Sequence, residues 1–357
     1  MEPVTHMLTG ACMARACGFN RRARYATLAM VIAAEIPDAD FVYTAVSPLS
    51  YFRHHRGWSH TFLWMPLWAA ITVGIVYAWH RWKTRASRPQ PKDAPPLRWG
   101  FLFGICFLAL LSHIFLDWTN NYGVRPFAPF NPRWYQGEIV FVVEPVMVII
   151  LGLALALTPL FRLTDREIGA RDPRNRGQLL ASVGLALIVT LWSWRWYERD
   201  KAMQIAAQQE MLHDEPIVKL QMSPLPFTPW RWAAIIETPS YYQVGMVDTR
   251  TGMMSRTAQD IFWKGPVTPA IQAAKESELG HVYLDWSKAP LVEDLGLVQN
   301  DPDLAGLRMV RFRDARFLYD VLSYHGREES PLQAIAYLDA QNRVVRIRMN
   351  GPDARAR

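Results

Sequence analysis

The chain has 357 residues, of which half are hydrophobic and 20% are charged, with a net charge of +7 and a mean hydropathy of −0.03. This composition excludes a disordered chain, a collagen-like chain and a small disulfide scaffold. It does not exclude a membrane protein that carries a polar domain, because an average over the whole chain conceals differences between its parts.

The first 40 residues contain two short apolar stretches, at residues 6–19 and 25–37, separated by three arginines at 20–24. Each stretch is shorter than the roughly 20 residues that a helix needs to cross a bilayer. We therefore expect an N-terminal helical hairpin over residues 6–40 that is buried against other helices.

Four longer apolar stretches follow. We expect membrane spans near residues 61–79, 99–116, 139–161 and 178–196. The first has no charged residue over 19 positions, and the third has only Glu144 over 23 positions. The sequence therefore predicts an α-helical polytopic membrane bundle over residues 1–197.

The remainder, residues 198–357, has ordinary charge density, and we expect it to form a C-terminal soluble α+β domain. Residues 334–349 alternate between apolar and polar positions on both sides of a polar turn, which predicts a β-hairpin. We expect residues 281–286 to form another strand. Residues 268–279 are expected to form a helix that ends at Gly280.

Lys and Arg are concentrated in three of the predicted loops. The loops at 20–24, 80–98 and 162–177 carry three, six and five such residues, whereas 47–60 and 117–138 carry two each. Basic loops mark the cytoplasmic side of a membrane protein. We therefore expect the C-terminal domain to be periplasmic and no nucleic acid partner, with an inverted topology as the alternative.

Histidines and aspartates are concentrated at the predicted outer membrane level. Five of the nine histidines lie at this level of the membrane half, and the expected threading brings them close to three aspartates; these residues are His6, His54, His55, His60, His113, Asp38, Asp40 and Asp117. Ionisable groups at this depth are costly and usually functional. The cluster predicts a metal site or a proton relay. The three cysteines show no Cys-x-x-Cys spacing and are not expected to bind metal.

The local patterns agree with this interpretation. His113 and Asp117 are four residues apart, so they share one face of a helix. Asp38 and Asp40 follow Pro37, where we expect a helix to end. Ser59 is expected to cap the helix that follows it.

Three further charged residues are candidates for the chemistry. Glu144 lies inside a predicted span, where an unpaired carboxylate is expensive, so we expect it to face the bundle interior as a ligand, a partner to an imidazole or a general base. Arg53 and Arg56 flank the histidines. Their guanidinium groups would suit an anionic substrate such as a phosphate, with interface anchoring as the alternative.

Several motifs follow one another in the order of a known family: Thr5-His6 with Leu8-Thr9-Gly10, Ile36-Pro37-Asp38-Ala39-Asp40, His55-Arg56-Gly57-Trp58-Ser59-His60 and His113-Ile114-Phe115-Leu116-Asp117. Over about residues 1–160 the chain resembles the YdjM-type, LexA-regulated, predicted membrane-bound metal-dependent hydrolases. That family is distantly similar to zinc-dependent phospholipase C and the P1-type nucleases, which use His/Asp clusters on phosphodiesters. Residues 200–357 carry no such resemblance.

The resemblance implies a metal-dependent hydrolase of the bacterial inner membrane. The implied metal ligands are His6, Asp38, Asp40, His55, His60, His113 and Asp117. The cation would be Zn, with Mn or Fe as alternatives. Asp40 or Glu144 would accept a proton, and Arg56 would neutralise the charge of a phospholipid or another amphiphilic phosphoester. A non-catalytic scaffold with a structural metal site and an ion or solute transporter are the other interpretations.

Overall fold

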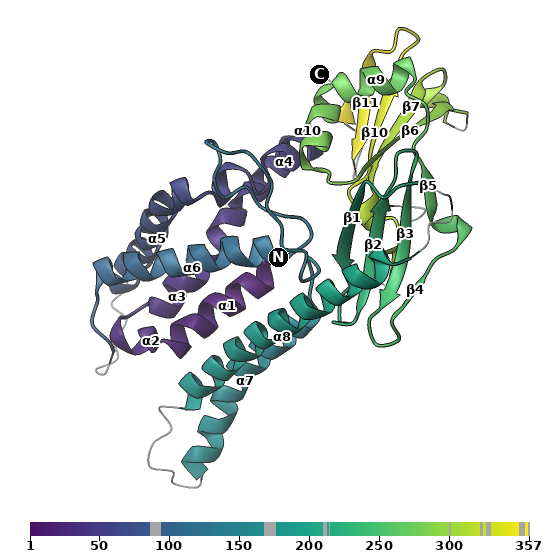
Figure 1. The fold of residues 1–357 in the computed structure, drawn as a ribbon. Helices are drawn as coiled ribbons and strands as arrows, with labels where there is room; N and C mark the ends of the chain where they lie inside the picture. Colours follow the sequence, from purple (N-terminus) through teal and green to yellow (C-terminus); the bar gives the residue numbers. More distant parts are fainter. Residues whose placement is uncertain are drawn as a thin grey trace. The chain divides into compact units, whose positions relative to one another are not determined.

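The computed structural model describes residues 1–85, 94–167, 176–209, 213, 215–299, 301–321, 324–325, 330–349 and 354–355. They form two compact units, and the colours of Figure 1 follow the chain from purple at the N-terminus to yellow at the C-terminus. The first unit comprises Met1–Asp40 and His55–Trp196, and the second comprises Phe41–His54 and Tyr197–Arg357. The sequence did not predict that Phe41–His54 belongs with the second unit.

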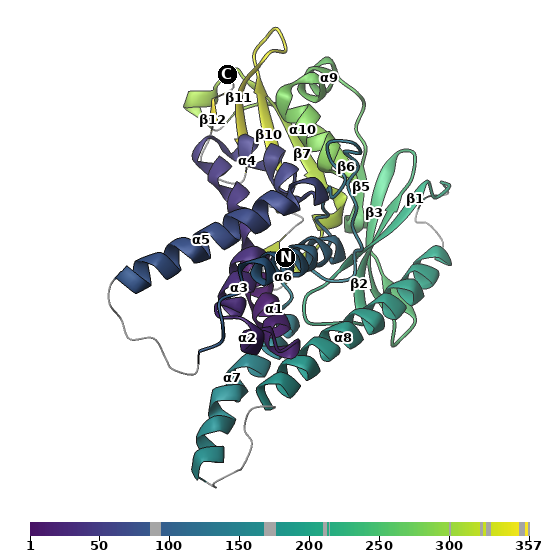
Figure 2. The ribbon, with the colours of Figure 1, turned by 90° about the vertical axis from the view of Figure 1, so that its left-hand side faces the viewer.

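The N-terminal hairpin forms as predicted. It consists of α1 (Pro3–Ala16), α2 (Phe19–Arg22) and α3 (Ala26–Glu35). The Glu2 side chain caps α1 by accepting a hydrogen bond from the Thr5 backbone N–H. Helices α1 and α3 lie side by side in both views (Figure 1, Figure 2). Their approach is close at Gly10, where a Cβ atom would lie 2.7 Å from the Met30 carbonyl oxygen.

Three segments of the described chain are long and apolar enough to cross a membrane: Phe62–Arg85, Trp99–Thr119 and Arg176–Ala207. They contain α5 (Met65–Arg85), α6 (Trp99–Thr119) and α8 (Arg176–Ala207). The spans predicted near 61–79, 99–116 and 178–196 are confirmed as long apolar helices. Large apolar side chains such as Leu111 and Phe115 are exposed on their surfaces, as expected of helices that face lipid.

The fourth predicted span, 139–161, differs from the structure. Helix α7 (Pro145–Glu167) begins at Pro145, and the apolar part of it whose side chains the structure describes, Pro145–Leu160, is shorter than a span. Proline favours the first position of a helix because its missing N–H needs no partner there. Val140 instead forms an isolated β-bridge with Asn120. Parts of the predicted basic loops, 86–93 and 168–175, lie outside the described residues.

The second unit contains two antiparallel sheets in its described part. The first has the order β1-β2-β3-β4, with β5 also paired to β3, and comprises β1 (Lys219–Pro224), β2 (Arg231–Glu237), β3 (Tyr241–Asp248), β4 (Met253–Ser255) and β5 (Ile261–Trp263). The second has the order β12-β11-β10-β7-β6 and comprises β6 (Pro290–Leu297), β7 (Arg308–Asp314), β10 (Ala334–Leu338), β11 (Val344–Met349) and β12 (Ala354–Arg355). A short pair, β8 (Asp320–Val321) and β9 (Tyr324–His325), lies apart from both. The predicted hairpin over 334–349 is confirmed as β10 and β11.

The helices of the second unit are α4 (Pro48–His54), α9 (Pro269–Glu276) and α10 (Glu278–Trp286). The strand predicted at 281–286 is therefore wrong, because these residues belong to α10. The Ser277 side chain starts this helix by accepting a hydrogen bond from the Gly280 backbone N–H. Serine at this position is a strong helix-start signal, and it outweighs the strand-like composition that follows.

The helix predicted over 268–279 is present only as α9, and Gly280 does not end it. Gly280 lies in the first turn of α10, where a Cβ atom would lie 2.3 Å from the Ala274 carbonyl oxygen. The glycine is therefore needed because two consecutive helices meet closely at this position.

We expect the Gly10→Ala substitution to destabilise the first unit by about 1–3 kcal/mol, the usual cost of overpacking, because the added methyl group collides with the Met30 carbonyl oxygen. Thermal unfolding of the purified protein in detergent measures the effect. Gly74→Ala in α5 is the control, since no atom lies within 4 Å of its Cβ position. Equal melting temperatures for the two variants would contradict the close packing of α1 on α3.

Candidate metal centre

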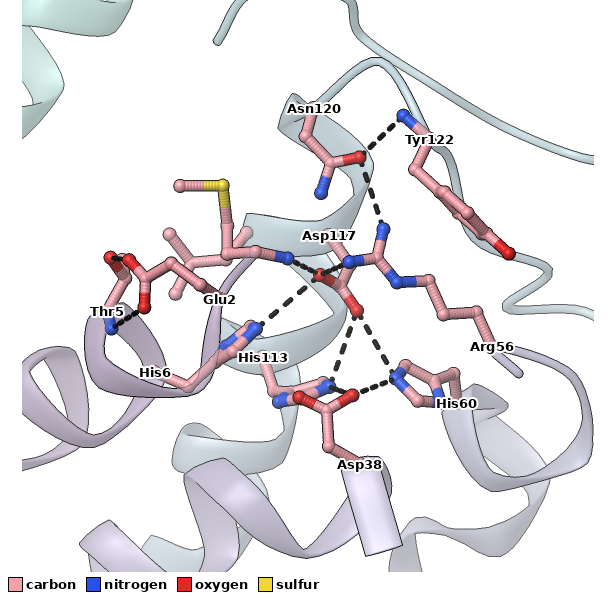
Figure 3. A network of polar contacts seen from close by, with 12 residues as sticks. Glu2, Thr5, His6, Asp38, Arg56, His60, His113, Asp117, Asn120 and Tyr122 are labelled. Carbon is pink, nitrogen blue, oxygen red and sulfur yellow. Dashed lines mark hydrogen bonds and ion pairs between the residues drawn. The ribbon is translucent and has the colours of Figure 1, made fainter. Parts of the chain in front are cut away.

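Asp117 is the centre of a buried polar network (Figure 3). It lies in the last turn of α6, and its side chain is fully buried. Oδ2 lies 3.2 Å from His60 Nε2 and 3.4 Å from His113 Nε2. Oδ1 lies 2.9 Å from Arg56 Nη2 and 3.5 Å from His6 Nε2, and it also contacts the Met1 amino group. Segments far apart in the sequence therefore meet at one carboxylate.

His113 lies one helical turn before Asp117 and on the same face of α6, as predicted. Its Nδ1 is 2.6 Å from the Ala34 carbonyl oxygen, which can only accept, so Nδ1 carries the proton. Nε2 then presents a lone pair to the cluster, which is the arrangement found for histidines that bind metals. The His6 ring stacks on the His113 ring with centroids 3.8 Å apart.

Asp38 and Asp40 lie in a 3₁₀ segment, Ile36–Ala45, that follows α3. Asp38 Oδ1 is 3.1 Å from His60 Nε2 and 3.8 Å from His113 Nε2. Asp40 instead organises the turn at residues 55–60. Its Oδ2 accepts hydrogen bonds of 3.0 Å from the Arg56 backbone N–H and from the Ser59 hydroxyl, and its Oδ1 is 3.1 Å from His55 Nδ1.

His60 connects the two aspartates with Asp117. Its Nε2 faces Asp38 and Asp117, and its Nδ1 is 2.9 Å from the Ser59 hydroxyl. Burial alone would lower the pKa of His60, but hydrogen bonds to the two carboxylates raise this pKa to about 9. The same negative potential that favours a proton on His60 favours a bound cation. The prediction that Ser59 caps the following helix is wrong. Its hydroxyl contacts His60 Nδ1 and Asp40 Oδ2 instead.

Two groups of described residues place their ligand atoms within 4.8 Å of one another. One is Asp38, His60, His113 and Asp117, and the other is Asp38, Asp40 and His55. Imidazole and carboxylate donors without a thiolate suit Zn or Mn. The histidine and aspartate side chains of the cluster could therefore hold a metal ion.

Unsatisfied polar atoms support this fit. His113 Nε2 and Asp117 Oδ2 are buried and have no partner in good hydrogen-bond geometry within the described part of the chain, although both lie at ion-pair distances from the cluster. A buried polar atom without a partner costs about 1–3 kcal/mol. A cation between these two atoms would satisfy both.

The structure brings most of the predicted ligands together. Six of the seven belong to the two groups, and His6 lies beside them against Asp117 and His113. His54, which the sequence also placed at this level, points elsewhere: its ring stacks on Tyr43, and its Nδ1 is 2.8 Å from the Ser50 carbonyl oxygen.

Arg56 is buried, and its guanidinium group contacts other residues of the protein. Besides Asp117, the group donates hydrogen bonds to the Asn120 side chain (3.1 Å) and the Gly123 carbonyl oxygen (3.2 Å), and it lies over the Tyr122 ring. These contacts position Asp117. The sequence did not predict a role for Asn120, whose side chain also accepts hydrogen bonds from the backbone N–H groups of Tyr122 and Gly123.

Glu144 is fully buried, as predicted, but it belongs to neither ligand group. Its Oε2 lies 3.1 Å from Arg195 Nη1 of α8. Arg195 also donates a hydrogen bond of 2.6 Å to the Ile139 carbonyl oxygen. The pair therefore connects the start of α7 to α8 in the first unit. Arg195 was not among the predicted residues.

Comparisons with known proteins agree with the cluster and the helices. A family model described as YdjM inner membrane protein matches residues 1–202. The chain is also similar to a Bacillus subtilis (strain 168) protein described as uncharacterized protein YfhP, with 24% identity over 264 residues, which cover 73% of this chain and 69% of that relative. No solved structure matches.

We expect Glu144→Gln to lower stability without lowering metal content. The substitution leaves Arg195 buried without its counter-charge, and breaking such a pair costs on the order of 3 kcal/mol. Thermal unfolding and metal analysis of the purified variant measure the two effects. Asp117→Asn is the comparison, and it should lose metal. A Glu144→Gln protein of normal stability that has lost its metal would place Glu144 in the metal chemistry instead.

Proposed function

Because this chain belongs to the family of YdjM inner membrane proteins, we propose that it is a membrane-bound metal-dependent hydrolase that cleaves a phosphoester in a phospholipid or another amphiphilic molecule. The observation that carries this proposal is the buried ligand group Asp38, His60, His113 and Asp117. Ionisable side chains at the end of a membrane span are expensive and are retained where they have a function.

The cluster formed by the two ligand groups would hold a divalent cation, with Zn as the first choice and Mn or Fe as alternatives. When bound, such a cation polarises a phosphoryl oxygen and lowers the pKa of a water molecule. The chain's own contribution is to fix the donors: the Ala34 carbonyl orients the His113 ring, Ser59 orients the His60 ring, and Arg56 holds Asp117. Arg56 is thus a positioning residue. Its contacts with Asp117, Asn120 and Gly123 account for the burial of its guanidinium group without a substrate phosphate.

Water and substrate would approach at the edge of the cluster formed by Asp38 and His55. Their side chains are 15% and 14% exposed, whereas those of His60, His113 and Asp117 are completely buried. Asp40, the predicted proton acceptor, is completely buried and contacts His55 through Oδ1, 3.1 Å from His55 Nδ1. Its carboxylate would stabilise a positive charge beside His55, and this charge would be either a proton taken from water or a bound metal ion.

An apolar groove supports an amphiphilic substrate. A groove of about 590 Å³ lies along α6, lined by Leu108, Leu111, Phe115 and Trp118 and, from outside this helix, by Phe62 and Phe127. The helix that supplies His113 and Asp117 thus also carries a surface suited to an acyl chain. The basic loops of the sequence support placing the site at the outer face of the inner membrane, with the C-terminal domain periplasmic.

A non-catalytic scaffold is the second candidate function. Four protein ligands are the number found in closed, structural zinc sites, whereas catalytic sites keep a position open. The group Asp38, His60, His113 and Asp117 alone would fit a structural metal.

The test is hydrolysis by the purified protein in phospholipid vesicles. We expect metal-dependent release of a phosphorylated headgroup or of phosphate, which is lost on treatment with a chelator and restored by Zn or Mn. His113→Ala should reduce the rate of hydrolysis to background, because the substitution removes a buried nitrogen, Nε2, that would bind the metal. His54→Ala is the matched control and should keep the wild-type rate. Metal binding without turnover of any phosphoester would favour the scaffold.

A further inference from the structure

We infer that the cluster binds two divalent cations in unequal sites that share Asp38, a closed site and an open site. Asp38 belongs to both groups of potential ligands. This inference deepens the proposed function, and its chemical part rests on that function. Its test is metal stoichiometry, which does not depend on turnover.

The closed site consists of Asp38, His60, His113 and Asp117. Four protein donors complete the coordination that zinc takes in structural sites. Three of these side chains are completely buried, and Asp38 is the one that is partly exposed. A cation here would hold the cluster together.

The open site consists of Asp38, Asp40 and His55. Three protein donors with a position left for water or substrate are typical of catalytic sites. Asp38 and His55 are both partly exposed. Asp40 Oδ2 is already held by the Arg56 backbone N–H and the Ser59 hydroxyl, so Oδ1, which faces His55, is the atom that would bind.

The charges of the cluster favour a second cation. Asp117 contacts the Arg56 guanidinium and the Met1 amino group. By contrast, Asp38 and Asp40 contact no Lys or Arg side chain among the described residues and meet only histidines and neutral donors. The positive charge nearest to these two carboxylates is therefore a proton on His60, and a bound metal ion would offset their mutual repulsion in the same way.

Two cations that share one carboxylate would also narrow the substrate class. Pairs of metal ions about 3.5–4 Å apart stabilise both the attacking and the leaving oxygen of an in-line displacement at phosphorus. The open site would therefore suit a phosphoester, and a carboxylic ester would gain less from the second ion.

The first experiment counts metal ions. The full-length protein in detergent is saturated with Zn, separated from free metal by gel filtration and analysed by mass spectrometry. We expect two ions per chain in the wild type and in the matched control His54→Ala, and one ion in His55→Ala. The electron paramagnetic resonance spectrum of the Mn-loaded wild type should show two spin-coupled Mn ions, and His55→Ala should lose this coupling. One ion in the wild type, or two in His55→Ala, would overturn the open site.

The second experiment measures phosphoester turnover by the same Zn-saturated protein. Two ions without phosphoester turnover would refute the proposed function and not the open site.

Discussion

The burial of negative charge around Asp117 is the constraint on which the first unit depends. A carboxylate removed from water needs a positive partner, and each helix of the unit that reaches this point brings one or orients one. Helix α1 brings His6, α6 brings His113, and the turn after α4 brings Arg56 and His60. The close packing of α1 on α3 at Gly10 brings the end of α3, and with it Asp38, to the same place.

This dependence explains which parts of the site could be predicted. His113 and Asp117 share a face because helical geometry alone places residues four apart on one face, and the apolar stretch around them is clearly helical. The meeting of His6, Asp38 and His60 followed from a simple threading of the chain through a membrane. The pairing of Glu144 with Arg195 could not be predicted, because no local pattern relates α7 to α8. The support that Asn120 gives to Arg56 likewise depends on tertiary structure.

The fold shows a similar division. Hydropathy was sufficient for α5, α6 and α8, but the start of α7 was decided by Pro145, which the apolar run around it concealed. In the second unit, the aromatic and β-branched residues of 281–286 favoured a strand, and the capping of α10 by Ser277 decided otherwise. The membership of Phe41–His54 in the second unit has the largest consequence. The neighbours of this segment in the chain, Asp40 and His55, belong to the candidate metal centre.

X-ray absorption spectroscopy at the metal edge of the purified protein is the direct test of a metal centre built from histidines and aspartates. We expect a first shell of nitrogen and oxygen ligands at about 2.0–2.1 Å with the multiple-scattering pattern of imidazole rings. We expect no sulfur at about 2.3 Å, because Cys12, Cys17 and Cys106 belong to neither ligand group. A sulfur shell, or protein purified without any bound transition metal that also fails to take one up, would contradict it.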